Sequence, residues 1–269
     1  MNKKSFYLAA VWIFGLAFAA IASPIFLSAQ AQNMDFRHLL EAPSFAHWLG
    51  TDSLGRDLFA RLLCGTTVSL GVGVIAVAIA VVLGVLVGAF AGYTGGMCDR
   101  ILMAVVDILL CFPTFFLILA VIAVLGPGIF HVFLIIGLTS WMGTARLVRA
   151  EVLTLKEREY VLAARVMGAR SGWIIFRHLV PNALGVVIVN AILGLSAAIL
   201  TEGALSFLGI GVQPPIPSWG NILTDGRATL GVAWWLTLFP GLVIFLTVLS
   251  ANTLGEALDS HFRGDSHVA

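Results

Sequence analysis

The sequence predicts an all-α integral membrane protein with six transmembrane helices. Hydrophobic residues make up 59% of the 269 residues and charged residues only 11%, whereas an ordinary soluble domain carries roughly 25% charged residues. Six mostly apolar stretches reach the length of about 20 residues that a helix needs to cross a bilayer. No stretch alternates apolar and polar residues with a period of two, so a membrane β-barrel is not expected. The net charge of +1 gives no general attraction to nucleic acid.

The six predicted spans are separated by short stretches that are polar or rich in glycine and proline. They are residues 6–28, 67–92, 101–125, 129–148, 183–207 and 232–255. We expect residues 1–66 to form an N-terminal transmembrane anchor followed by a segment on the outer side of the membrane. Residues 67–269 would form the main transmembrane domain, with a cytoplasmic loop at 150–181.

The first span resembles a signal peptide in some respects. It begins with MNKK and is followed by small residues at 29–31. Its apolar run of about 20 residues is longer than the core of a signal peptide, which favours an uncleaved anchor. In both cases residue 32 onward emerges on the far side of the membrane.

Lysine and arginine are distributed unequally between the two sides of this topology. With an inside N-terminus, eleven of them fall inside and four outside. The inside set is Lys3, Lys4, Arg100, Arg146, Arg149, Lys156, Arg158, Arg165, Arg170, Arg177 and Arg263, and the outside set is Arg37, Arg56, Arg61 and Arg227. Because cytoplasmic loops carry the excess of positive charge, both termini and the loop at 150–181 are predicted to face the cytoplasm.

The second span carries a stripe of glycine. Gly84, Gly88 and Gly92 recur every four residues and therefore lie on one face of the helix. Small residues at this spacing let two helix backbones approach closely in lipid. The stripe therefore predicts a helix–helix contact.

Residues 150–181 are too polar to span the membrane and too apolar for a random linker. Charged side chains are interleaved with valine, leucine and isoleucine along this segment. A helix is expected over 157–169, and a second short helix starts near Gly172 with Ser171 as its cap. Pro181 marks the entry into the next span.

The stretch EYVLAARVMG, residues 159–168, places small residues on the first of these helices. Ala164 and Gly168 lie four residues apart and should share a helical face, which would admit another protein closely. The alternative is a surface helix that lies at the membrane interface, attracted there by its basic residues.

This segment resembles the EAA loop of ABC-transporter permease subunits, which reads E-A-A, three residues, G, nine residues and I-x-L-P. Four positions match that motif: Ala163, Ala164, Gly168 and Pro181. Three positions replace its glutamate, isoleucine and leucine: Leu162, His178 and Val180. The form Y-V-x-A-A-R-x-x-G-A is similar to that of the peptide/nickel importer permeases, and specifically of the C-type member of the pair.

Three further stretches are similar to the same subfamily, in the same order and topology. They are HWLGTDSLGRD at 47–57, LSFLGIGVQPP at 205–215 with PSWG at 217–220, and Asp107 followed by Phe112-Pro113. The likeness therefore runs from residue 47 to residue 220, and the spans extend it over almost the whole chain.

The resemblance implies a type I ABC importer permease fold with a cytoplasmic coupling helix, in the lipid of the bacterial inner membrane. It implies a homologous permease as heterodimer partner, two ATP-binding subunits and an extracytoplasmic solute-binding protein. The chain would form half of a pathway for di- or oligopeptides, or for a related solute such as nickel. ATP and magnesium would be bound by the partner subunits, so no cofactor is expected in this chain. The residues implied in coupling are Ala163, Ala164, Arg165, Gly168, Ala169 and Pro181.

The outer stretch HWLGTDSLGRD has the composition of a turn that leads into a helix. Gly50 and Gly55 permit tight backbone turns, and Asp52 is expected to cap a helix that begins near Arg56. Together with Asp57 these residues would hold the outer end of the bundle. A contact with the solute-binding protein is the alternative.

The loop at 208–231 combines prolines with Trp219, and Trp234 and Trp235 follow at the start of the next span. A proline-stiffened loop could cap the outer mouth of a pathway. The alternative is interfacial anchoring, because tryptophan is enriched at the edges of membranes.

Asp107 and Glu202 lie within or near predicted spans, where a charge is costly and usually faces protein or water. Asp107 could neutralise Arg100 or Arg146 near the inner face. Glu202 is expected to be a structural or protonated group near the outer end of the fifth span. The alternative for Glu202 is contact with an ammonium group of the cargo.

Motifs of other function classes are missing from the sequence. It contains no G-x-x-x-x-G-K-[ST] phosphate loop, no H-E-x-x-H and no G-x-S-x-G. No cysteine–histidine metal motif is present, His131 is expected to be packed or interfacial, and the cysteines Cys64, Cys98 and Cys111 are expected to be small packing residues. A stand-alone secondary transporter or channel remains the rival interpretation, although no inverted repeat is evident. A membrane enzyme is a more distant third.

Overall fold

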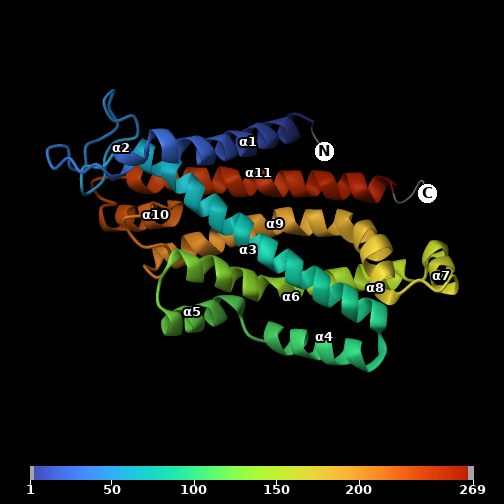
Figure 1. Ribbon diagram of the computed structural model, residues 1–269. Helices are drawn as coiled ribbons and strands as arrows, with labels where there is room; N and C mark the ends of the chain where they lie inside the picture. Colours follow the sequence, from blue (N-terminus) through green and yellow to red (C-terminus); the bar gives the residue numbers. More distant parts are fainter. Residues whose placement is uncertain (1–2, 266–269) are drawn as a thin grey trace.

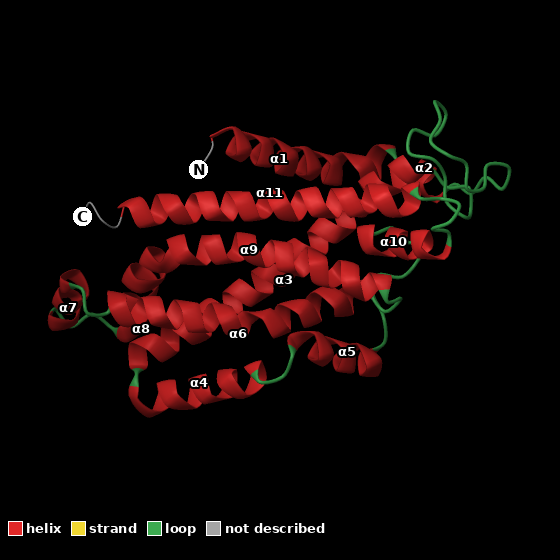
Figure 2. Cartoon of the chain, turned by 180° about the vertical axis from the view of Figure 1, so that it is seen from behind, coloured by secondary structure: helices red, strands yellow, loops and turns green. Residues whose placement is uncertain are grey.

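The apolar stretches form long helices in the computed structural model (Figure 1). The structure describes residues 3–265, so the first two letters of the MNKK start lie outside the described residues. Within residues 3–265 all regular secondary structure is helical (Figure 2). The elements are α1 (Lys3–Phe26), α2 (Ser28–Gln32), α3 (Leu58–Thr94), α4 (Gly96–Leu110), α5 (Thr114–Leu125), α6 (Ile129–Leu155), α7 (Glu159–Val166), α8 (Ser171–Ile174), the π-helical turn η1 (Ile175–Leu179), α9 (Val180–Phe207), α10 (Trp219–Ala228) and α11 (Trp235–Asp265).

Five of the six predicted spans are confirmed as single helices that are long and apolar enough to cross a membrane. They are α1, α3, α6, α9 with the short turns before it, and α11. α3 has 37 residues, which is about 55 Å at 1.5 Å per residue, so it extends beyond a hydrocarbon core of roughly 30 Å. Residues 66 and 67, where the sequence divides the chain, both lie within α3.

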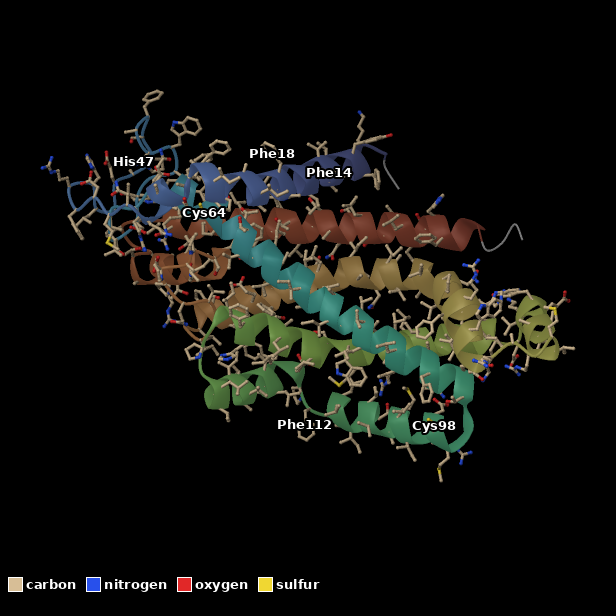
Figure 3. All side chains as sticks on the ribbon, viewed as in Figure 1. Phe14, Phe18, His47, Cys64, Cys98 and Phe112 are labelled. Atoms are coloured by element: carbon tan, nitrogen blue, oxygen red, sulfur yellow. The ribbon has the colours of Figure 1, made fainter. Side chains whose placement is uncertain are left out.

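The stretch 101–125, expected as one span, does not form a continuous helix. α4 and α5 are separated at residues 111–113 and meet at an angle of 81°. Pro113 lies at this break, where it precedes the first residue of α5. A proline ring clashes with the preceding helical turn and supplies no N–H group, so it ends α4 and starts α5. The third span is therefore a bent pair, and Phe112 points away from the bundle at the bend (Figure 3).

The glycine stripe forms the predicted helix–helix contact. α3 packs most extensively against α6, and a Cβ atom added to Gly84 would lie 2.5 Å from Thr144 Cβ. At Gly88 and Gly92 an added Cβ would meet backbone carbonyl oxygens of α6. Only glycine lets the two backbones come this close.

The two ends of the bundle carry different structures (Figures 1 and 2). One end carries α2, the irregular segment 33–57 and α10. The other end carries α7 and α8, and the first turn of α1 and the last turn of α11 point toward it. This arrangement agrees with the even number of crossings in the predicted topology. On α1, Phe14 and Phe18 project away from the bundle, as expected of a face toward lipid (Figure 3).

Candidate functional site

The segment that follows α6 forms two short helices at the α7 end of the bundle. Lys156 ends α6, and its Nζ donates a hydrogen bond to the Gly92 carbonyl of α3 at 3.1 Å. α7 begins at Glu159 and ends at Val166, which is shorter than the expected helix over 157–169. The chain then turns into α8, η1 and α9. The position of the segment is therefore fixed by the C-terminal end of α3 and by both spans that flank it.

Gly168 ends α7 in a left-handed conformation. Its φ is +81°, its N–H donates to the Arg165 carbonyl, and the Ala169 N–H donates to the Ala164 carbonyl, both at 3.0 Å. This pair of hydrogen bonds is the Schellman motif, which favours glycine at this position. The left-handed turn at the end of α7 therefore explains the glycine at position 168 of the EAA-like segment.

Ala164 does not share an open face with Gly168, so that prediction is wrong. Ala164 is buried and belongs to a core cluster with Val161, Leu155 and Ile174. Gly168 lies beyond the end of the helix. The i, i+4 rule holds only where the helix continues, and the Schellman turn redirects the chain before Gly168. Ala163, in contrast, is exposed.

The exposed surface of this segment carries large apolar side chains that no other part of the described chain covers. Val166 is 88% exposed and Met167 is 81% exposed. We call the exposed apolar residues Leu162, Val166, Met167, Trp173 and Phe176 the coupling surface, after the role that the sequence resemblance implies for this segment. The exposed residues Arg165, Arg170 and Arg177 lie in the same segment. Exposed apolar patches rimmed by polar residues mark contacts with proteins or membranes.

Arg165 also has a contact within the chain. Its guanidinium carbon lies 5.6 Å from the centre of the Tyr93 ring at the C-terminal end of α3, a cation–π distance. Ser171 is not the N-cap that the sequence predicts, because it is the first residue of α8 and its side chain accepts no capping bond. Pro181 is exposed in the first turn of α9, where its missing N–H costs nothing.

Two arginines of α6 pair with two acids of α4. Arg146 contacts Asp107, and both side chains are exposed. Of the two predicted partners of Asp107, the structure therefore selects Arg146 over Arg100. Arg149 Nη2 donates to Asp99 Oδ2 at 2.6 Å in a less exposed pair that the sequence analysis did not anticipate. These pairs hold the bent span against α6.

A groove of about 190 Å³ lies between α3, α6 and α9. Its lining is made of small apolar residues together with Ser140, Thr144 and Asn190. Asn190 Nδ2 donates to Thr144 Oγ1 at 2.9 Å, which links α9 to α6. Polar side chains within spans either join helices or face a water-filled path, and the bond from Asn190 to Thr144 joins two helices. None of these residues was predicted from the sequence to line a groove.

Glu202 is fully buried and serves as an anchor for the loop after α9. Ser69 of α3 donates to its Oε2 at 3.0 Å and Ser206 donates to its Oε1 at 2.7 Å. Each hydroxyl also accepts a backbone N–H, from Trp219 at 3.1 Å and Val212 at 3.0 Å. This geometry agrees with the predicted structural role and leaves the carboxyl group out of contact with any open path.

The outer stretch is held by a buried ion network. Asp52 is 0% exposed, and its carboxylate pairs with Arg56 at 2.6 Å and with Arg61. Arg61 Nη1 also lies 2.9 Å from Asp225 Oδ2 of α10. The network thus joins the segment before α3 and the first turn of α3 to α10, which is far from both in the sequence.

Asp52 is not the helix cap that the sequence predicts. Asp57 caps α3 instead, because its Oδ1 accepts the Ala60 N–H at 2.9 Å. Asp52 accepts the N–H groups of Leu54 and Arg56 within the preceding turn. At Gly55, which has a φ of +72°, an added Cβ would collide with the Asp35 backbone.

Trp219 is a core residue rather than an interfacial anchor. It is fully buried, and its Nε1–H donates to the Leu62 carbonyl at 3.2 Å. Trp235 is also buried and donates to the Thr51 carbonyl at 3.0 Å. Only Trp234 of the three is exposed, as an interfacial tryptophan would be. The first two were misassigned because their partners, residues 62 and 51, are remote in sequence.

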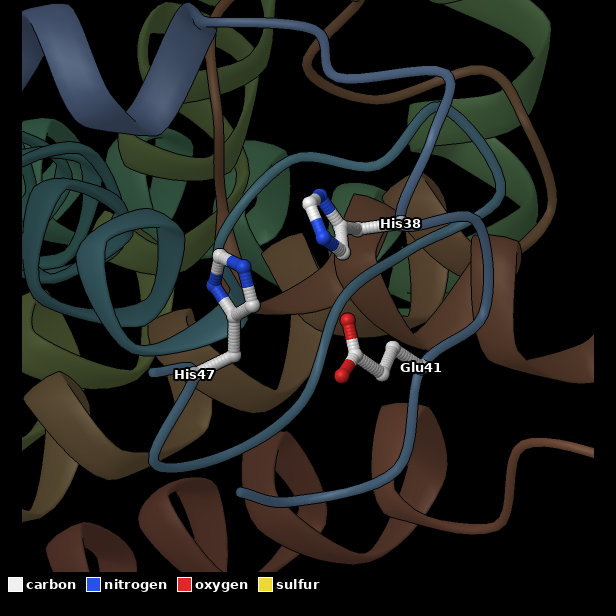
Figure 4. A group of neighbouring side chains, drawn as sticks. All are labelled: His38, Glu41 and His47. Carbon is white, nitrogen blue, oxygen red and sulfur yellow. The ribbon is translucent and has the colours of Figure 1, made fainter. Parts of the chain in front are cut away.

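The remaining histidines and cysteines differ in how far they are packed. His131 is packed as expected, with Nδ1 2.9 Å from the Gly126 carbonyl oxygen. Cys64 is buried, whereas Cys98 and Cys111 are exposed, so the expectation of packing holds for Cys64 only. The convergence of His38, Glu41 and His47 in the outer segment was not predicted from the sequence (Figure 4). Their spacing, H-x-x-E-x5-H, was the only available signal.

Residues 80–264 match the family described as "Binding-protein-dependent transport system inner membrane component". The chain belongs to this family. It is therefore a multi-pass inner-membrane permease of a binding-protein-dependent ABC importer, and the family implies ATP-binding and substrate-binding partners in general terms.

Relatives of this permease align over most of its length. It is 42% identical to the glutathione transport system permease protein GsiD of Pectobacterium atrosepticum, over 93% of this chain and 84% of the relative. It is 41% identical to the dipeptide transport system permease protein DppC of Alkalihalophilus pseudofirmus, over 89% and 79%. It is 38% identical to the oligopeptide transport system permease protein OppC of Bacillus subtilis, over 89% and 78%.

A solved structure supports the fold of the permease. A chain of the MetNI methionine ABC transporter, in inward-facing conformations, matches with a TM-score of 0.51 over 72% of this permease and 94% of that chain. The two sequences are 19% identical, so the likeness concerns the fold alone. The predicted importer permease fold is confirmed.

Proposed function

We propose that this permease forms half of a translocation pathway for peptides and that its coupling surface docks on an ATP-binding subunit. The observation that carries the docking proposal is the exposure of Val166 and Met167 at the tip of the bundle. Side chains of this size gain free energy when they leave water, about 25 cal/mol per Å² of apolar surface. The surface lies in the segment that resembles the EAA loop. A protein cleft at this end would cover it.

The docking proposal is tested by one substitution on each end of the bundle. Met167→Asp places a charge on the coupling surface, and Phe45→Asp makes the same kind of change at a fully exposed apolar side chain of the outer segment. Neither residue is buried in this chain, so both variants should fold. Met167→Asp should lose the ATP-binding subunits on co-purification of the complex, while Phe45→Asp should retain them. Retention of both would show that this segment lies at the lipid interface instead.

The proposed assembly contains a homologous permease as heterodimer partner and two ATP-binding subunits. The sequence supports this division of labour, because it holds no phosphate-binding loop of its own. ATP and magnesium would accordingly bind to the partner subunits, and this chain would hydrolyse nothing. Purification of the complex through a tag on this chain, followed by measurement of subunit stoichiometry, tests the proposal. One copy of this chain for every two ATP-binding subunits is the expected result.

Peptides are the proposed cargo because the aligned relatives are named for glutathione, dipeptide and oligopeptide transport. The groove between α3, α6 and α9 would supply this chain's share of the pathway, with Ser140, Thr144 and Asn190 offering hydrogen bonds to amide groups. Uptake of a labelled dipeptide by cells that carry the complete system, compared with uptake of nickel, tests the cargo class. Uptake of nickel alone would contradict it.

The proposed orientation places both termini and the coupling surface in the cytoplasm. The excess of lysine and arginine in these segments supports it. Single cysteines at Ser171 and Ala46, both exposed, would be introduced in a background without the three native cysteines. An impermeant thiol reagent added to intact cells should label position 46 and not position 171. Labelling of both positions would rule out the six-span topology.

A further inference from the structure

Three side chains with metal-binding atoms converge in the outer segment, away from the coupling surface and the groove. They are His38, Glu41 and His47, and one ligand atom from each lies within 4.8 Å of the others. Figure 4 shows the two imidazole rings and the carboxylate facing a common space. The ring centres lie 5.7 Å apart. Nothing in the transport function described above uses these residues.

A carboxylate orients each imidazole by a hydrogen bond from Nδ1, the ring nitrogen that does not face the common space. His38 Nδ1 lies 2.9 Å from Asp35 Oδ2, and His47 Nδ1 lies 2.9 Å from Asp57 Oδ2. A carboxylate accepts a proton-bearing nitrogen, so Nδ1 carries the hydrogen in both rings and the Nε2 lone pairs are free. Metal-binding histidines are held in this way, because the outer carboxylate fixes the tautomer and makes the free nitrogen more basic.

The carboxylate of Glu41 has an oxygen that the protein leaves without a partner. Glu41 Oε2 is buried and accepts no hydrogen bond from the described residues. Buried polar atoms are normally hydrogen-bonded, and an exception calls for an explanation such as an ion. The backbone of Glu41 is fixed on both sides by Thr51, through its hydroxyl at 2.8 Å and its N–H at 3.0 Å. The orphan oxygen is therefore presented by a rigid turn.

We propose that His38, Glu41 and His47 bind one divalent transition-metal ion of the Zn²⁺ class. Two imidazoles and one carboxylate are a donor set that zinc uses in open sites with a water in the fourth position. Imidazole nitrogen favours zinc, nickel and copper over magnesium and calcium, which take oxygen ligands. The carboxylates of Asp35, Glu41 and Asp57 lie beside the two rings and further favour the binding of a cation.

The fit requires only a small closure of the site. Ligand atoms around a tetrahedral zinc ion lie about 3.4 Å apart, given bonds of roughly 2.0–2.2 Å. The side chain of His38 is 46% exposed, so its ring can move inward without displacing core residues. Leu40, between two of the proposed ligands, has a φ of +50°. A bulky residue seldom adopts this conformation, and such strain concentrates at functional sites.

The ion would fasten the outer segment to α3. Asp57 binds His47 through Oδ2 and caps α3 through Oδ1. A metal bound to His47 would therefore connect residues 38–47 to the first turn of the longest helix. Occupancy should raise the thermal stability of this end of the permease, because a ligand that binds only the folded state stabilises it.

The test uses the full chain, purified in detergent through a tag without histidine and stripped with a chelator. Zn²⁺ bound per chain is measured by equilibrium dialysis and elemental analysis, with Mg²⁺ as the comparison ion. The variants are His38→Ala and Glu41→Gln, in which the fold keeps its backbone contacts, and Asp35→Asn, which alters only the orienting carboxylate. His131→Ala removes a histidine elsewhere and is the matched control.

We expect one Zn²⁺ per chain, no competition by Mg²⁺ and a melting temperature that rises with Zn²⁺. His38→Ala and Glu41→Gln should each weaken binding by at least about tenfold, and Asp35→Asn by roughly 10–100-fold, as orienting residues do. His131→Ala should bind like the parent. Binding that is absent in the parent at micromolar free Zn²⁺, or equal in the parent and His38→Ala, would overturn the proposal whatever the outcome for transport.

Discussion

The buried ion network at the outer end makes Asp52→Asn a severe substitution. The Asp52 carboxylate is fully buried and binds the guanidinium groups of Arg56 and Arg61. Asparagine keeps an oxygen for the two backbone N–H groups that Oδ1 accepts. It loses the negative charge, however, and its NH₂ group would face two donors. Two buried cations are left with too little counter-charge.

The magnitude follows from burial. Removing one partner of a buried ion pair costs roughly 3–5 kcal/mol, because the remaining charge cannot reach water. Both arginines are almost fully buried here. Asp225 stays 2.9 Å from Arg61 and 3.6 Å from Arg56. Because both arginines keep this second carboxylate, the loss of stability should not reach the cost of two unpaired charges. For a chain of this size each kcal/mol lowers the melting temperature by roughly 2–4 °C, so the expected fall is roughly 6–20 °C.

Cys64 provides the assay for this change. It is buried in the first part of α3, whereas Cys98 and Cys111 are exposed and would be replaced by serine. Heating in detergent with a thiol-reactive fluorophore then reports the exposure of Cys64 on unfolding. The matched control is Asp225→Asn, the same chemical change at a carboxylate that is 28% exposed. It should cost only about 1 kcal/mol. If Asp52→Asn melts no earlier than Asp225→Asn, the reasoning from burial is refuted.

Three other substitutions test the helix contact, the buried acid and the end of α7. Gly88→Ala should destabilise the permease by roughly 1–3 kcal/mol, because the new Cβ would collide with the backbone of α6. Gly71→Ala has open space around the new Cβ and should not destabilise the permease. Thermal melts of the two variants test this difference. Glu202→Gln should lower the free energy of unfolding by roughly 1–3 kcal/mol, because the NH₂ group of glutamine cannot accept a hydrogen bond from a hydroxyl. It should leave the KM for cargo unchanged. A raised KM with a normal melting temperature would mean that Glu202 contacts the cargo. Gly168→Ala should reduce transport-coupled ATP hydrolysis, because alanine in the left-handed conformation costs roughly 1–2 kcal/mol and loosens the end of α7. Gly168→Asn should retain most of the ATP hydrolysis. Equal rates of hydrolysis in the two variants would contradict this explanation.

Hydropathy predicted five spans well because each is one unbroken apolar run. It failed at the third, since Phe112-Pro113 lies inside a run of ordinary length and proline is tolerated in many membrane helices. Only the structure shows that this proline ends one helix and starts another. The i, i+4 argument for Ala164 and Gly168 failed for a related reason: a φ of +81° at Gly168 stops the helix before the rule applies.

The outer end was the hardest part to predict because its contacts join distant residues. The pairing of Arg61 with Asp225 and the burial of Trp219 against Leu62 have no local pattern in the sequence. His38, Glu41 and His47 are close in sequence, yet an irregular loop without helical or strand periodicity brings them together. The motif HWLGTDSLGRD indicated a turn and a helix start correctly. The different contacts of Asp52 and Asp57 within it depend on the fold and do not follow from the sequence alone.

α3 gives the outer segment and the coupling surface a direct mechanical link. It begins after Asp57, whose carboxylate also holds His47, and near its other end the Tyr93 ring lies beside Arg165 of α7. The glycine stripe holds α6 tightly against it, so α3 and α6 should move as one body. The α4–α5 pair, broken at Pro113, is the natural place for bending. A displacement imposed on α7 by a bound ATP-binding subunit would therefore be carried to the outer end along α3, rather than absorbed within the bundle.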